Sequence, residues 1–304
     1  MTVCCADDRS CRHPLSPVHI ETSLGDMTTD TISPDTDHAG FVAGWEDWHA
    51  GHETQRAAAD GFLAITGLHF LTNEPARFED APGAWSVDEV GPVVELAAGE
   101  QLSVDGVELS GLHSFGAIAE REGVNAQAGD AVIEIARRGG ELIVRPRHPD
   151  TEFRAAYAGT PTYLPTPGWR VEARFLPFDP PRSVTVGAAV EGLQHVYSAP
   201  GELEFVHDGE TSRLTAFNGH APGSLLVLFT DATSGLTTYA ANRALTVAAP
   251  DAEGRTILDF TRAVNLPCAY TDYATCPLPP AENRLPFAVE AGERTPVARL
   301  AVTL

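Results

Sequence analysis

Short segments in which apolar and polar residues alternate recur along most of the chain. In residues 169–178, WRVEARFLPF, the apolar side chains from Trp169 to Phe175 point one way and the charged ones between them point the other. Turn-forming residues follow at intervals of roughly 8–12 residues, which is typical of all-β folds. The pattern therefore predicts an all-β protein, an antiparallel barrel-like or sandwich domain.

Two of the predicted strands are joined by a recognisable turn. The segments AVIEIARR (131–138) and ELIVRPR (141–147) flank Gly139-Gly140, and two glycines between strand-like runs favour a tight β-hairpin. Among the other strands, we expect one at PFAVEA, residues 286–291.

A single long segment has helical periodicity. Residues 39–60 place aromatic rings and imidazoles on one stripe and polar residues on the rest, so we expect one N-terminal amphipathic helix packed on the β structure. The stripe consists of Phe41, Trp45, Trp48, His49 and His52.

The first 38 residues differ in composition from the rest. They are rich in Thr, Asp, Ser and Pro and lack apolar periodicity, so we expect residues 1–38 to be a disordered tail. Met27 offers an alternative start of the chain, and residues 39–304 are interpreted as one β-rich domain. The spacing of the cysteines in the tail fits zinc binding poorly; the residues concerned are Cys4, Cys5, Cys11 and His13.

Charge and the absence of motifs exclude several classes of function. The formal net charge is -22, and all 20 basic residues are arginine, so the surface repels nucleic acid.

The apolar runs are too short for membrane spans, and the N-terminus lacks the features of a secretory signal, which makes the cytoplasm the expected location. The chain has no Walker loop, no Gly-x-Gly-x-x-Gly and no Gly-x-Ser-x-Gly, and we expect no cofactor.

The segment DFTRAVNLPCAYTDYATCPLPP, residues 259–280, has an unusual composition. Its prolines lack backbone donors, so it is not an interior strand. Long irregular segments in compact domains are commonly functional, and we expect this one to cover an opening of the β structure. Cys268 and Cys276 lack zinc-ligand spacing and are interpreted as small buried thiols, although a reactive role stays open.

Several motifs in the second half resemble a known family. The run F-x-D-x-T-S-G-x-x-T-Y-x-x-x-R-x-L spans Phe229 to Leu245, and Asp259-Phe260 and residues 275–280, TCPLPP, follow it. Over about residues 39–294 the chain resembles the domain of unknown function 1684 family of bacterial and archaeal proteins. It departs from that family at Thr261 and Leu266. The resemblance implies no particular reaction.

The polar residues of this half form our predicted ligand site. Arginines would supply positive charge for an anionic or sugar-like small molecule, carboxylate and amide groups would orient it, and tyrosines would line the pocket beneath the 259–280 lid. Whether the molecule is bound or also turned over stays open. The predicted ligand-binding residues are Asp231, Tyr239, Arg243, Asp259, Arg262, Asn265, Tyr270, Tyr273 and Arg284.

Two alternatives remain at this point. The 259–280 segment could be a packing clasp or a partner-binding surface of an interaction module, with a second copy of the chain as one candidate partner. A weaker alternative is a metal-dependent hydrolase that uses His49, His52 or Cys268. Because both histidines fall on the aromatic stripe, we predict no metal site.

Overall fold

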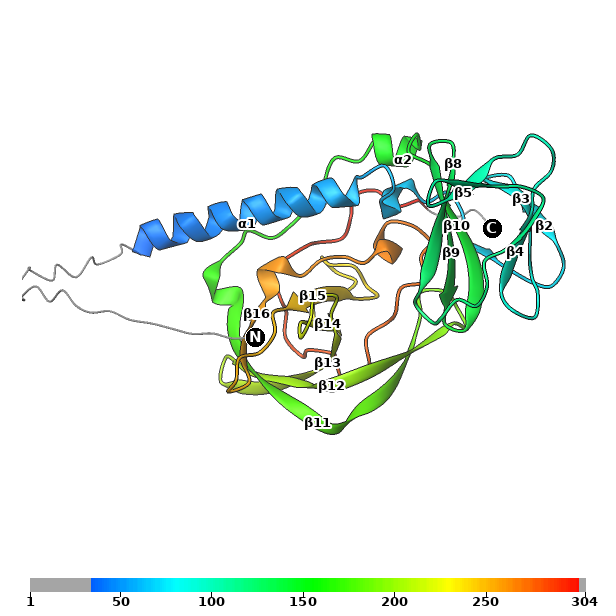
Figure 1. The fold of residues 1–304 in the computed structure, drawn as a ribbon. Coiled ribbons are helices and arrows are strands. Elements are labelled where there is room, and N and C mark those ends of the chain that lie inside the picture. Colours follow the sequence, from blue (N-terminus) through cyan, green and yellow to red (C-terminus); the bar gives the residue numbers. More distant parts are fainter. Residues whose placement is uncertain (1–33, 301–304) are drawn as a thin grey trace, which may run out of the picture.

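The computed structural model describes residues 34–300, and its long helix is α1, Pro34–Arg56 (Figure 1). The helix begins inside the predicted tail and ends before the predicted end at residue 60. Residues 1–33, with Cys4, Cys5, Cys11 and His13, lie outside the described residues, so the predicted tail and the alternative start at Met27 stay predictions. No helix within residues 34–300 is long and apolar enough to cross a membrane.

Two sheets form an N-terminal β unit, which follows α1 in the chain. One has the strand order β1-β10-β9-β8-β5-β6 and the other β2-β3-β4-β7. They share one apolar core, in which Trp85 and Val94 from the second sheet meet Ile133 and Ile135 from the first. The strands are β1 His69–Phe70, β2 Ala76–Phe78, β3 Ala81–Val87, β4 Pro92–Glu95, β5 Leu102–Val104, β6 Val107–Leu109, β7 Leu112–Ser114, β8 Gly123–Ala128, β9 Ala131–Arg138 and β10 Glu141–Arg147.

The predicted hairpin of β9 and β10 is confirmed at its predicted boundaries. Gly139 and Gly140 both have positive φ, 61° and 86°, as a two-residue hairpin turn requires. This turn sets the register of the whole hairpin, in which Glu134 on β9 pairs with Arg145 on β10.

The C-terminal β unit is a single antiparallel sheet of order β15-β14-β13-β12-β11-β16. Figure 1 shows its long strands curving around the C-terminal part of the chain, and Phe260, Leu285 and Val289 from that part fill the core. The strands are β11 Arg170–Gly187, β12 Gln194–His207, β13 Glu210–Asn218, β14 Leu225–Phe229, β15 Arg243–Val247 and β16 Arg255–Asp259.

The predicted fold class, all-β with one long N-terminal helix, is therefore confirmed. The other helical pieces are short: η1 Phe62–Ala64, α2 Glu152–Ala155, η2 Pro167–Trp169, η3 Phe260–Arg262 and η4 Pro267–Ala269. The two β units have separate apolar cores. That residues 39–304 act as one domain stays a prediction.

Two segments near the C-terminus, residues 260–280 and 286–291, contain no strand. After Asp259, the last residue of β16, residues 260–280 form no strand, as expected, but much of this segment is buried: Cys268, Tyr270 and Cys276 are 1%, 0% and 7% exposed. The strand predicted at 286–291 is wrong. The Arg243 guanidinium donates to the carbonyl oxygens of Val289 and Ala291, so these backbone acceptors serve a buried cation instead of a neighbouring strand.

The two β units meet closely at the tip of the β9–β10 hairpin. A Cβ atom at Gly139 would lie 2.5 Å from the carbonyl oxygen of Gln194, at the start of β12. Only glycine permits this approach, because no real side chain tolerates such a contact. The hairpin therefore sits against the edge of the C-terminal unit and helps to form the cleft described below.

Candidate functional site

Two of the predicted ligand residues, Asp231 and Arg243, pair with each other inside the C-terminal core. Arg243 Nη2 lies 2.6 Å from Asp231 Oδ2, and both side chains are 1% exposed. Asp231 also accepts a hydrogen bond from the backbone of Thr233 at 2.6 Å. The pair thus holds together the loop after β14 and the 289–291 segment.

A second pair lies at the surface beside α1. The carboxylate of Asp259 is 3.6 Å from Arg262 Nε and 3.4 Å from Arg170 Nε. The guanidinium of Arg262 lies over the ring of Trp48, 5.2 Å from its centroid. These contacts connect β16, η3 and the helix.

The remaining five predicted residues are scattered. Asn265 and Tyr270 border the polar cluster around α1, whereas the hydroxyl of Tyr239 donates to the carbonyl of Cys268 at 2.8 Å. Tyr273 is half-buried in the 259–280 segment, and Arg284 is exposed. The nine residues therefore do not surround one cavity, and their ligand-binding roles stay predictions.

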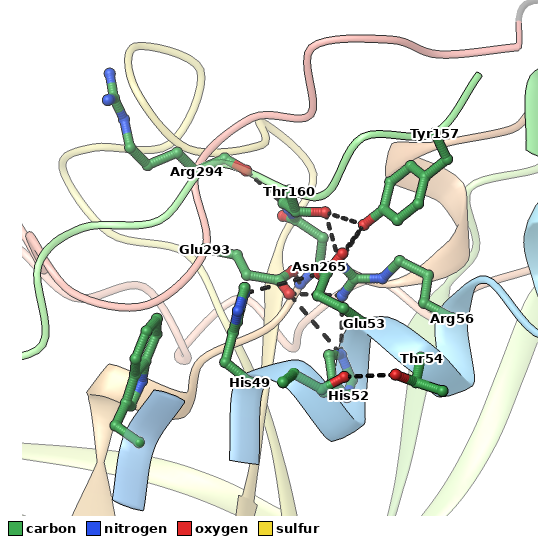
Figure 2. Close-up of polar contacts among 12 residues, drawn as sticks. His49, His52, Glu53, Thr54, Arg56, Tyr157, Thr160, Asn265, Glu293 and Arg294 are labelled. Atoms are coloured by element: carbon green, nitrogen blue, oxygen red, sulfur yellow. Dashed lines mark hydrogen bonds and ion pairs between the residues drawn. The ribbon is translucent and has the colours of Figure 1, made fainter. Parts of the chain in front are cut away.

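The polar cluster around α1 is centred on Arg56, whose side chain is fully buried (Figure 2). Its guanidinium donates to the carboxylates of Glu53 and Glu293, each at 2.5 Å. It also donates to the hydroxyls of Tyr157 at 3.0 Å and Thr160 at 2.5 Å. A single cation thus connects the helix with the 157–160 loop and with residue 293.

Burial also changes the acid–base behaviour of this cluster. Desolvation, with a further contribution from Arg56, lowers the pKa of His52 to about 4. His52 Nε2 lies 2.8 Å from Arg56 Nη2, so the neutral imidazole accepts this hydrogen bond. Desolvation likewise lowers the pKa of His49 and raises that of Tyr157 to about 12.

Three groups of the cluster have the spacing of metal ligands. A nitrogen of His49 and carboxylate oxygens of Glu53 and Glu293 lie within 4.8 Å of one another. Each carboxylate oxygen, however, already accepts a hydrogen bond: two come from Arg56, one from Tyr157 and one from the backbone of Asn265. Arg56 occupies the place of a cation, so the arrangement suits the docking of α1 better than metal binding.

A different site lies between the two β units. It is a cleft of about 520 Å³, which we call the arginine cleft. Among the described residues that line it, four are arginines and one, Asp60, is an acid. The side chains that line it include Arg121, Arg138, Arg145, Arg147, His195, Tyr197 and Cys276.

Three of these arginines converge on the carboxylate of Glu134, which is 5% exposed. Arg138 donates to it at 2.7 Å, Arg145 reaches both oxygens at 2.9 and 2.8 Å, and Arg147 donates at 2.5 Å. Burial alone would raise the pKa of Glu134, but the field of Arg145 and Arg147 outweighs burial and holds this pKa below its usual value. One negative charge thus faces three positive ones, an excess of two.

The opposite wall of the cleft belongs to the C-terminal β unit. The Arg121 guanidinium lies 4.7 Å from the ring centroid of Tyr197 on β12. His195 is buried beside it and uses Nε2 for a 2.7 Å contact with the carbonyl of Thr275. Nε of Arg147 is buried and has no hydrogen-bond partner within residues 34–300, whereas Nδ1 of His195 lies 3.8 Å from a carboxylate oxygen of Glu120.

Part of the arginine cleft had a signal in the sequence. The Gly139-Gly140 turn implies that Glu134 opposes Arg145, and alternation then places Arg138 and Arg147 on the same face. The contributions of Arg121 and His195 depend on the packing of the two units and have no local signal. Pro267 and residues 274–277 of the predicted lid also line the cleft.

Comparisons with known proteins agree with the resemblance seen in the sequence. The chain is similar to an uncharacterized protein of Haloarcula marismortui whose solution NMR structure is known: the identity is 35%, the match covers 47% of this chain and 80% of that one, and the TM-score is 0.40. No curated protein matches the chain. Residues 155–294 match the family described as Protein of unknown function (DUF1684), and the chain belongs to this family.

Proposed function

We propose that this protein binds a small anionic molecule in the arginine cleft. The observation that carries the proposal is the excess of positive charge around Glu134, where one buried carboxylate faces three guanidinium groups. This excess occurs in a chain whose formal net charge is -22. Like charges gathered in a partly desolvated place repel one another, and a bound anion relieves this repulsion.

Burial and, to a smaller extent, this repulsion both act on Arg138. Burial, with a contribution from Arg145, lowers the pKa of the Arg138 guanidinium even though Glu134 is its direct partner. An anion in the cleft would favour the charged form of all three arginines. Guanidinium groups also match the geometry of phosphate, sulfate and carboxylate groups, which accept two parallel hydrogen bonds.

The cleft also offers a donor that the protein leaves unused. Arg147 Nε lacks a hydrogen-bond partner in the part of the chain that the structure describes. The Arg121 guanidinium lies over the aromatic ring of Tyr197. A phosphate-, sulfate- or carboxylate-bearing molecule would supply acceptors for these groups, and the tyrosine ring would pack against its less polar part.

This proposal keeps the predicted role of the 259–280 segment but changes the residues that bind. Residues 274–277 would form one wall of the binding site, while Arg121, Arg145 and Arg147 would take the place that the sequence suggested for Arg243, Arg262 and Arg284. The proposal concerns binding, and no reacting group is assigned. The expected partner is a metabolite-sized anion in the cytoplasm.

The competing candidate is a structural role, in which the segment acts as a packing clasp and the arginines join the two β units. The burial of Cys268, Tyr270 and Cys276 favours it. The two candidates differ in their response to anions. A clasp is indifferent to phosphate, whereas a binding site is stabilised by it.

The test is a thermal-unfolding screen followed by titration calorimetry. Inorganic phosphate, sulfate, citrate and a phosphate monoester are compared with chloride at equal ionic strength, for the wild type and for Arg121→Gln and Arg213→Gln. Arg213 is exposed on β13 and pairs with Glu204, away from the cleft, so it controls for general loss of charge. We expect at least one of these anions to raise the unfolding temperature of the wild type above its value in chloride.

Arg121→Gln should weaken binding of that anion roughly 10–100-fold, the equivalent of one charge-assisted hydrogen bond, while Arg213→Gln should not. Arg121→Gln should leave the stability without anion nearly unchanged, because no ion pair of Arg121 is present within residues 34–300. Equal responses of the two variants, or no anion effect beyond that of chloride, would rule out the proposal in favour of the clasp.

A further inference from the structure

Cys268 and Cys276, the free cysteines among the described residues, lie in contact within the 260–280 segment. The backbone N–H of Cys268 donates to Cys276 Sγ at 3.3 Å, and both side chains pack in one small cluster with Ala274. The chain between them folds back through η4 and a turn. Neither thiol takes part in the proposed anion binding.

We infer that Cys268 and Cys276 are an oxidation site, which closes to a disulfide when a small hydroperoxide enters the arginine cleft. Geometry is the first reason. A disulfide requires the two sulfur atoms to approach to about 2 Å, and the 3.3 Å contact between the backbone nitrogen of Cys268 and Cys276 Sγ already places the two residues side by side. Closure therefore needs side-chain rotation and no rearrangement of distant elements.

Access is the second reason. Cys276 lines the arginine cleft, whereas Cys268 lies behind it at 1% exposure. Hydrogen bonds hold the backbone of both cysteines in place. The carbonyl of Cys276 accepts one from Ala189 N at 2.8 Å, and the carbonyl of Cys268 accepts one from the Tyr239 hydroxyl at 2.8 Å. A reagent in the cleft therefore meets Cys276 first, with Cys268 held behind it to complete the bond.

The electrostatics of the pair favour loss of one proton. The hydrogen bond from Cys276 lowers the pKa of the Cys268 thiol, and the pKa of Cys276 is raised in return, because the two sulfurs share one proton. The backbone N–H of Cys268 and the field of Arg145 favour charge on Cys276, but the neighbouring sulfur and burial outweigh them, so the Cys276 thiolate forms only when its proton moves to Cys268. The thiolate is the form of cysteine that reacts.

The chemistry balances with the hydroperoxide as the only oxidant. The Cys276 thiolate attacks the outer oxygen of the O–O bond, which breaks, and the remaining oxygen leaves as an alcohol, or as water from hydrogen peroxide, after taking up the proton of the pair. Cys276 becomes a sulfenic acid. The Cys268 thiolate left by that transfer then attacks this sulfur, the S–O bond breaks, and hydroxide leaves as water after taking up a proton from solvent, which replaces the one that the pair lost at the start. The two thiols lose two electrons and the peroxide gains them.

The test is peptide mass spectrometry on the full chain carrying Cys4→Ser, Cys5→Ser and Cys11→Ser, so that Cys268 and Cys276 are its cysteines. The folded protein is treated with a small excess of hydrogen peroxide, denatured, alkylated with iodoacetamide and cleaved after arginine. Residues 263–284 form one such peptide, which contains both cysteines. We expect it to carry no alkyl group after peroxide and two when a reductant precedes alkylation.

Two variants test the order of events. In Cys268→Ser, Cys276 should stop at the sulfenic acid and react with dimedone. In Cys276→Ser, Cys268 should react with peroxide at least tenfold more slowly. Double alkylation of the 263–284 peptide after peroxide, or oxidation confined to disulfides between two chains, would overturn the inference. Unchanged reactivity of Cys268 in Cys276→Ser would overturn the route through the cleft.

Discussion

Glu134 on β9 lies directly opposite Arg145 on β10, and their side chains form a two-point contact at 2.9 and 2.8 Å. This cross-strand pair organises the arginine cleft, since Arg138 and Arg147 reach the same carboxylate from either side. The arrangement stabilises the hairpin, but three guanidinium groups share this one carboxylate, so the four groups together carry an excess of positive charge. Structure and proposed function therefore depend on the same carboxylate.

Replacing this carboxylate should destabilise the fold strongly. In Glu134→Gln three guanidiniums remain around a neutral amide, and loss of one partner of a buried ion pair costs about 3–5 kcal/mol. Urea unfolding should show the loss, whereas the exposed neighbour change Glu141→Gln should stay within about 0.5 kcal/mol of the wild type. Sulfate should restore part of the stability of Glu134→Gln. An unchanged stability of this variant would contradict the role given to the carboxylate.

The stability should depend on pH through His52. Its pKa is about 4 in the folded chain and 6.5 in the unfolded one, so the unfolded state takes up more protons between these values. Stability is therefore fully present above pH 6.5 and falls as the pH drops towards 4, by about 2 kcal/mol after allowance for the partial exposure of the ring.

Unfolding measured between pH 7 and pH 4.5 checks this expectation. His52→Gln should flatten the profile in this window, while His38→Gln, which alters an exposed histidine of the same helix, should retain the wild-type slope. Equal slopes for wild type and His52→Gln would contradict it. Carboxylates such as Glu134 add their own loss of stability at lower pH, below about 4.5.

Arg56 should be the main attachment of α1. Arg56→Gln removes the cation between Glu53 and Glu293 and leaves Glu293 buried without its ion pair, which we expect to cost about 3 kcal/mol or more. Hydrogen exchange should rise along α1 more than in β9 or β13. Arg77→Gln, which breaks an exposed pair with Glu100, serves as the control with a small effect. Unaltered exchange in α1 would show that other contacts hold the helix.

Chelation of metal should leave the protein unchanged. The carboxylates of Glu53 and Glu293 already accept five hydrogen bonds, two of them from Arg56, so a divalent ion near His49 would have to displace a buried guanidinium. We expect no change of unfolding temperature with EDTA and no stoichiometric metal in elemental analysis. A stabilisation by zinc that disappears in His49→Ala would restore the metal-dependent alternative.

Local patterns in the sequence sufficed for much of the fold. The Gly139-Gly140 turn and the alternation after Trp169 predict strands that the structure contains, because both depend on neighbours in the chain. The pattern at 286–291 failed for a non-local reason. Its carbonyls bond to the side chain of Arg243, which the sequence suggested for ligand binding and which lies in the core.

The site was less accessible to prediction than the fold. Cys276 and the segment that carries it were singled out from composition, and the segment does line a cleft. The arginines of that cleft come from residues 121–147, whose charges look like ordinary solvent-facing positions of strands. Their convergence with His195 arises only when the two β units pack, and nothing within either segment specifies that contact.

The division of the cleft between the two β units has an evolutionary consequence. The family match covers residues 155–294, which includes His195, Tyr197 and Cys276 but none of the four arginines. A homologue that kept this half and joined it to a different N-terminal partner would inherit a thiol-bearing wall and acquire a new selectivity opposite it. Under the proposed anion binding, the charge of the site would therefore come from the half that the family match does not include.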